Sequence, residues 1–209
     1  MKSQQTKKKI SKELNKLRSE VKIIDEELKE TEYDEHENPA NYTTDELTVC
    51  RAIQDMLYVL KFHQMLCENH NIVLQNVIRQ QNNFDGKMKQ LSFDFPTFYA
   101  KILEQFQKLF NNNTSDILNQ LVETLTESIQ GPCKLNQKAL VNAKILDSSR
   151  EYIANFEKPN EIEHLGFNTE EEIEGIGELK GKIVTLLTSL LEGEIDMDII
   201  TRMVFSFDQ

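Results

Sequence analysis

The chain has 209 residues, a net charge of −11 and a pI near 4.9. An acidic chain repels the phosphates of nucleic acids, and no apolar run approaches the ~20 residues that span a bilayer, so we expect neither nucleic-acid binding nor a direct membrane span. Helix-forming residues dominate, and 7 Gly and 4 Pro are few for the turns of an all-β protein, which predicts an all-α fold.

The N-terminal segment, residues 1–32, is predicted to contain an amphipathic helix. Apolar residues recur there at alternating steps of four and three, which is the a/d spacing of a coiled coil. They are Ile10, Leu14, Leu17, Val21, Ile24 and Leu28. The run covers only about three heptads, which is marginal for an isolated coil. We therefore expect residues 10–28 to bind a partner surface as one helix, with a short coiled coil as the alternative.

A linker is predicted over residues 33–44, because Pro39 and the neighbouring Asn and Asp residues interrupt the helical pattern. Residues 45–209 are then expected to form one helical domain. Its first helix should run from about Asp45 to Cys67, with Thr44 as the N-cap.

The later helices are predicted from apolar periodicity and from Gly, Pro and Asn at their ends. They are expected at Ile72–Gln80, Phe95–Phe110, Thr114–Gln130, Leu135–Phe156, Thr169–Gly193 and Met197–Val204. A loop should contain Pro159 and Gly166. Several helices are apolar on more than one side and so require burial in layers. The predicted fold class is an irregular armadillo-like helical solenoid or a bundle.

Motifs for zinc, phosphate and nucleophilic chemistry are incomplete. His63 and Cys67 could share a helix face and contact zinc, but no second pair completes the four ligands of a structural site. The segment Gly175–Gly181 lacks the G-x-G-x-x-G pattern and a preceding strand, so its glycines are expected to allow close helix packing instead. No EF-hand loop or catalytic triad pattern is present, and we expect no enzymatic activity.

Two predicted helix ends carry carboxylates. Glu68 and His70 follow the end of one helix, and Glu127 and Gln130 lie in the last turn of another. A carboxylate at a helix C-terminus is unfavourable beside the helix dipole, and two such carboxylates brought together would repel each other. A hard cation with oxygen ligands would relieve both effects. The alternative is that each glutamate is exposed to water.

Two longer motifs resemble a known family. "LCENHNIVLQNVIRQQNN" (Leu66–Asn83) and "LTESIQGPCKLNQ" (Leu125–Gln137) resemble the receptor-homology-associated region that inositol trisphosphate receptors and ryanodine receptors share. "LLTSLLEGEIDMDIITRMV" (Leu186–Val204) is similar to the helix pair that follows this region. The resemblance covers about residues 47–205 and is most specific at the first two motifs.

The resemblance implies a cytosolic helical module of a large tetrameric calcium-release channel at the endoplasmic reticulum, which relays ligand state to the gate. In that family two glutamates hold the activating Ca²⁺, and a backbone carbonyl from the segment after the pore helices completes the site. The matching residues here are Glu68 and Glu127, and His70 and Gln130 match the residues around those ligands. Without the third ligand, we expect Ca²⁺ to bind weakly.

Two functional hypotheses remain open. In the first, the chain is a non-enzymatic regulatory module that assembles with other segments or subunits of the channel. In the second, it is a stand-alone helical scaffold that docks into a larger assembly, with residues 10–28 as a candidate docking helix.

Overall fold

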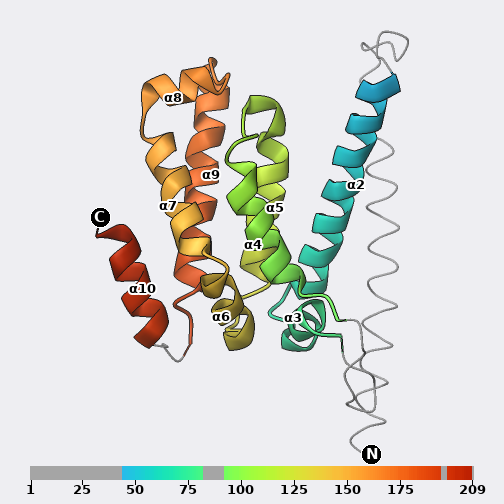
Figure 1. The fold of residues 1–209 in the computed structure, drawn as a ribbon, viewed down its shortest axis with the longest axis vertical. Coiled ribbons are helices and arrows are strands. Elements are labelled where there is room, and N and C mark those ends of the chain that lie inside the picture. The colour runs from blue at the N-terminus through green and yellow to red at the C-terminus, as the bar shows by residue number, and fades with distance from the viewer. Residues whose placement is uncertain (1–43, 82–91, 194–196, 209) are drawn as a thin grey trace, which may run out of the picture. The chain divides into compact units, whose positions relative to one another are not determined.

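A computed structural model describes residues 44–81, 92–193 and 197–208 (Figure 1). The chain divides into two compact units, residues 1–55 and 56–209. The described part of the first unit, residues 44–55, is the N-terminal half of helix α2 (Thr44–Cys67). The amphipathic helix predicted within residues 1–32 lies outside the described residues, and so does the predicted linker up to residue 43.

The regular elements of the described residues are all helices, which confirms the predicted all-α fold class. After α2 they are α3 (Ile72–Arg79), α4 (Phe95–Phe106), a short 3₁₀ helix η2 (Asn112–Thr114), α5 (Ser115–Glu127), α6 (Lys134–Asn142), α7 (Ile145–Phe156), α8 (Pro159–His164), α9 (Glu170–Ser189) and α10 (Met197–Phe207). The layered packing within residues 56–209 is compatible with the predicted irregular solenoid or bundle.

Helix α5 lies at the centre of the second unit, between α4 on one side and α9 on the other, and α7 packs against both α4 and α9 (Figure 1). The buried apolar residues of α5 form one wide stripe, and α4 and α9 both pack against this helix. These residues are Ile117, Leu118, Leu121, Val122 and Leu125. Helix α10 packs against α7 at the edge of the unit.

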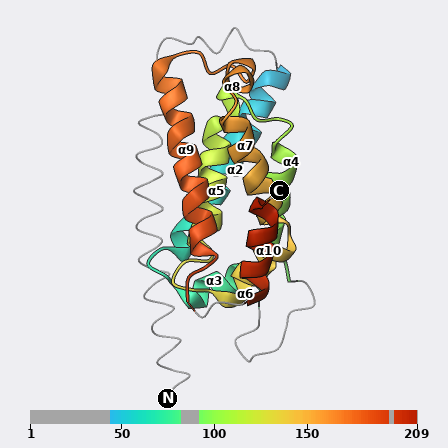
Figure 2. The same ribbon diagram turned by 90° about the vertical axis from the view of Figure 1, so that its left-hand side faces the viewer.

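Three helices end at the same end of this unit. The chain runs down α2, α5 and α9 toward the short helices α3 and α6, which lie there together (Figures 1 and 2). The C-terminal end of a helix carries a partial negative charge and up to four carbonyl groups without helical partners. Three such ends therefore create a region that attracts hydrogen-bond donors and cations.

The predicted helix Leu135–Phe156 is wrong, because the structure contains two helices there. The chain breaks at Ala143 and Lys144, and Lys144 adopts a left-handed conformation with φ of 63°. The break allows the pairs Leu140–Val141 and Ile145–Leu146 to be buried on both sides of it. A continuous helix would have rotated one of these pairs toward water.

Other boundaries differ by smaller amounts. Helix α4 ends at Phe106 instead of Phe110, and α10 continues to Phe207. Helix α8 begins at Pro159 in the predicted loop, in agreement with the preference of proline for the first turn of a helix. Within the described part of the chain, the glycines of α9 do not mediate close packing, because a Cβ atom added at Gly175, Gly177 or Gly181 would meet none of its atoms within 4 Å.

Candidate functional site

The turn that joins α2 to α3 has an unusual backbone. Cys67 ends α2 fully buried, and the next residues include Asn69 and His70 with φ of 58° and 54°. Asn and His tolerate this left-handed region better than most residues. Asn71 then accepts a hydrogen bond from the Leu74 N–H at 3.4 Å and caps α3. The turn thus places Glu68 and His70 between two helices of different direction.

The turn that joins α5 to α6 lies directly against the first one. It follows Glu127, the last residue of α5, and contains Gly131 with φ of 76°. A Cβ atom at Gly131 would lie 2.3 Å from the Cβ atom of His70. Real Cβ atoms do not approach so closely, so only glycine allows this contact. The residues predicted as the two halves of one site are brought together here.

The electrostatics of Glu127 reflect this contact. The side chains of Glu68 and Glu127 are both half-buried. Burial raises the pKa of Glu127 above its ordinary value, and the negative charge of Glu68 raises it further, while His70 acts in the opposite direction. The ionised form of Glu127 is therefore disfavoured in the folded protein. A nearby cation would favour it.

Two buried amides join the helices around this contact, and the sequence did not identify them. Gln75 of α3 donates from Nε2 to the carbonyl oxygens of Glu127 at 2.7 Å and Gln130 at 2.8 Å. Asn136 of α6 donates from Nδ2 to the carbonyl oxygens of Gln75 at 2.9 Å and Ser128 at 2.8 Å. One feature of the sequence could have indicated that Gln75 is buried: it lies three residues before the apolar Ile78, on the same side of the helix.

The α5–α6 turn also contacts the C-terminal end of α9. The Gly131 N–H donates to Oε2 of Glu192 at 3.0 Å, and Gln130 Nε2 lies 3.4 Å from Oγ of Ser189. A Cβ atom at Gly193 would lie 2.5 Å from Cγ of Pro132. The turn is therefore held between the α2–α3 turn on one side and the end of α9 on the other.

The pair His63 and Cys67 belongs to the interior. Nδ1 of His63 is hydrogen-bonded to the Tyr99 hydroxyl, and burial lowers the pKa of His63. Burial raises the pKa of Cys67, and the nearby Glu127 and Cys133 raise it further. Within the described residues, no group of three or more His, Cys, Asp or Glu side chains is arranged to hold a metal ion. The geometry therefore gives no support to the zinc alternative.

None of the described helices combines the length and the apolar character that crossing a bilayer requires.

Comparison with known proteins connects the two turns to a family. Residues 51–153 match the family described as RyR and IP3R Homology associated, and this range includes Glu68, His70, Glu127 and Gln130. The chain belongs to this family. The predicted resemblance to inositol trisphosphate and ryanodine receptors is thereby confirmed.

Within this RyR and IP3R Homology associated family, one relative is the inositol 1,4,5-trisphosphate receptor itr-1 of Caenorhabditis elegans. It is 30% identical over 152 residues, which are 70% of this chain and 5% of that receptor. The chain therefore spans only a small part of the length of the curated relative that it matches.

Proposed function

We propose that this chain is a non-enzymatic regulatory module of an intracellular calcium-release channel, in which Glu68 and Glu127 bind Ca²⁺ and the helical body relays binding toward the gate. The observation that carries the proposal is the close packing of the two turns that carry the half-buried Glu68 and Glu127, where a Cβ atom at Gly131 would lie 2.3 Å from that of His70. Family membership and the match to an inositol 1,4,5-trisphosphate receptor support the channel part of it.

The fit to Ca²⁺ rests on oxygen chemistry. Two carboxylates supply at most four oxygens, whereas Ca²⁺ takes six to eight oxygen ligands. They lie where α2 and α5 end, so the partial negative charges of two helix C-termini add to the attraction for a cation. His70 and Gln130 border the site, because His70 packs on Gly131 and Gln130 is held by Gln75.

The incomplete ligand set predicts weak binding by the chain alone. Water or a segment of another part of the channel would supply the missing oxygens. Calcium affinity falls with the number of charged ligands and with the rigidity of the site, and weak calcium sites have dissociation constants on the order of 10⁻⁴ to 10⁻³ M. The proposal therefore includes assembly with other receptor segments or subunits, in a tetramer at the cytoplasmic face of the endoplasmic reticulum.

The relay follows from the bridging geometry. An ion bound by both glutamates favours the arrangement in which the two turns are closest. Because the α5–α6 turn also contacts the end of α9, this preference extends to helices that do not touch the ion. Two sites coupled in this way affect each other reciprocally.

Calcium titration by calorimetry tests the proposal. Wild type is compared with Glu68→Gln and Glu127→Gln, and Asp116→Asn is the matched control because it removes one carboxylate from the opposite end of α5. We expect binding of Ca²⁺ in the millimolar range by wild type and the control, and at least tenfold weaker binding by the two glutamine variants. Equal titrations for all four proteins would remove calcium sensing from the proposal.

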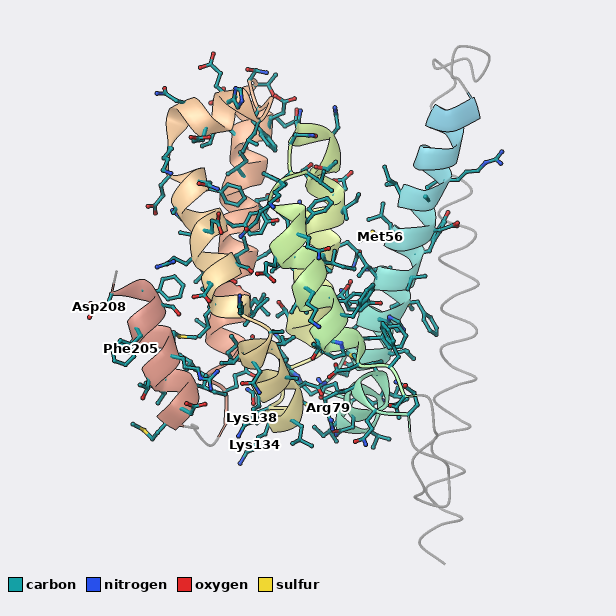
Figure 3. All side chains as sticks on the ribbon, in the orientation of Figure 1. Met56, Arg79, Lys134, Lys138, Phe205 and Asp208 are labelled. Carbon is teal, nitrogen blue, oxygen red and sulfur yellow. The ribbon has the colours of Figure 1, made fainter. Side chains whose placement is uncertain are left out.

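A stand-alone scaffold remains the second candidate function, and α10 favours it. Met197, Val204 and Phe205 on this helix are 68%, 56% and 67% exposed, and Phe205 lies on the outer side of α10 (Figure 3). Apolar side chains clustered on a surface helix are typical of protein–protein contacts. Light scattering on wild type and on Phe205→Ser tests this: a mass above that of the monomer only for wild type would support a scaffold that self-associates.

A further inference from the structure

The buried amide of Gln75 connects α3 to the end of α5. Gln75 is fully buried, and its Nε2 group donates to two carbonyl oxygens, that of Glu127 at the end of α5 and that of Gln130 in the turn after it. These carbonyls have no partner within α5 because the helix ends there. Gln75 thus acts as the C-terminal cap of α5, and one of its two acceptors belongs to Glu127 itself.

Asn136 extends this connection to α6. It is also fully buried, and its Nδ2 group donates to the carbonyl oxygens of Gln75 and Ser128. Oε1 of Gln75 and Oδ1 of Asn136 are buried and have no hydrogen-bond partner among the described residues. Reversing either amide would place its oxygen against carbonyl oxygens, so each NH₂ group must face the carbonyls that it binds.

We propose that Gln75 and Asn136 are positioning residues for the candidate cation site, and that they fix Glu127 relative to the turn that carries Glu68. The inference rests on the proposed calcium function. Helix α3 begins directly after the Glu68–Asn71 turn, so a side chain of α3 that binds the Glu127 carbonyl ties one half of the site to the other. Asn136 of α6 binds the same end of α5, because its amide donates to the carbonyl oxygen of Ser128.

The chain contains a matched control for this proposal. Gln137, the residue after Asn136, is 3% exposed, and its Nε2 group donates to the carbonyl oxygens of Ser189 at 2.9 Å and Glu192 at 3.2 Å. It therefore caps the C-terminal end of α9 as Gln75 caps that of α5. The two glutamines are alike in burial and in chemistry, but only the side chain of Gln75 donates to carbonyl groups of Glu127 and Gln130.

The experiment compares Gln75→Met with Gln137→Met, since methionine keeps the length of the side chain and removes both donors. We expect both variants to unfold at a lower urea concentration than wild type. We expect the dissociation constant for Ca²⁺ to rise roughly 10-fold or more in Gln75→Met, as it does for other residues that orient metal ligands. In Gln137→Met it should change less than about twofold. Asn136→Leu serves as a second variant if Gln75→Met does not fold.

A second measurement does not depend on calcium. Nuclear Overhauser contacts between His70 and Gly131 report whether the two turns stay together. We expect these contacts to weaken in Gln75→Met and to stay as in wild type in Gln137→Met. Equal calcium affinities and equal His70–Gly131 contacts in these two variants would overturn the positioning role.

The two proposals fail in different ways. If Glu127→Gln binds Ca²⁺ as wild type does, the calcium function is wrong. The His70–Gly131 contacts in Gln75→Met then still decide whether Gln75 holds the two turns together. If Glu127→Gln loses binding while Gln75→Met retains it, the calcium function stands and the positioning role is wrong.

Discussion

Two glutamates at opposite kinds of helix end show how position decides the role of a carboxylate. Glu172 lies in the first turn of α9, where its carboxylate accepts hydrogen bonds from the N–H groups of Asn168 and Thr169, both at 2.8 Å. The Asn112 amide donates to it at 2.6 Å. These bonds lower the pKa of Glu172 to about 2. Glu127 ends α5, where burial and Glu68 raise its pKa.

The difference separates a structural carboxylate from a candidate ligand. The Glu172 carboxylate accepts hydrogen bonds from Asn168 and Thr169, which precede α9, and from Asn112 of η2, so it needs no ion. Glu127 has its backbone carbonyl held by Gln75, while its side chain faces another negative charge. A cation beside Glu127 would stabilise its negative charge, whereas a cation beside Glu172 would have to displace existing hydrogen bonds.

The largest effect is expected for Gly131→Ala, which separates the two turns of the site. The added Cβ atom would lie 2.3 Å from that of His70, and φ of 76° disfavours alanine. We expect the free energy of unfolding to fall by about 2–4 kcal/mol, measured by urea denaturation. The pKa of Glu127 should fall as Glu68 moves away. A variant as stable as wild type would contradict the close contact between the turns.

Replacing the two glutamates by glutamine should change stability in opposite directions at neutral pH. Glu127→Gln removes a charge that the fold disfavours, so the free energy of unfolding without calcium should rise. Glu172→Gln removes a charge that the fold favours, so the free energy of unfolding of this variant should fall. Urea denaturation of both variants beside wild type measures this. Changes of the same sign would contradict the conclusion that the fold disfavours the charge of Glu127 and favours that of Glu172.

The pH dependence of stability should distinguish the same two residues. The pKa of Glu172 in the folded state, about 2, lies below its ordinary value of 4.5, so its contribution is complete above pH 4.5 and is lost as pH falls toward 2. The pKa of Glu127 lies above 4.5, so the folded state takes up this proton first and gains stability as pH falls to 4.5. Differences in unfolding free energy between each variant and wild type, measured from pH 7 to 2, test both signs.

The smallest effect is expected at Gly177, which contrasts with Gly131. A Cβ atom at Gly177 would meet nothing within 4 Å, and the residue lies in the interior of α9. Gly177→Ala should therefore raise the free energy of unfolding by about 0.5–1 kcal/mol, since alanine loses less backbone entropy in a helix. Calcium affinity should not change, which makes this variant a control for Gly131→Ala. A destabilised Gly177→Ala would mean that α9 has a neighbour on this side.

The sequence predicted helices best where local signals mark their ends. Gly131 and Pro132 ended one predicted helix near its true end, and Thr169 began another as the cap of α9. The break at Lys144 carries no such signal, because lysine rarely adopts φ of 63° and tertiary burial of the flanking apolar pairs decides it.

The candidate site was predictable only in part. Local patterns placed Glu68 and Glu127 at helix ends. The proximity of the two turns depends on packing between segments far apart in the chain, so local patterns could not predict it. The family resemblance suggested that these two glutamates share a site. Gln75 and Asn136 were not predicted, since an amide in a helical segment is usually exposed. Only the tertiary contacts reveal that both are buried and hold the end of α5.

The turn at Gly131 and Pro132 has no spare room on either face. His70 occupies the space beside Gly131, and Pro132 occupies the space beside Gly193, so a methyl group fits at neither glycine. A backbone packed this tightly is difficult to compress. A displacement of His70 toward this turn would therefore press on Gly131, and a displacement of Pro132 would press on Gly193 after the end of α9.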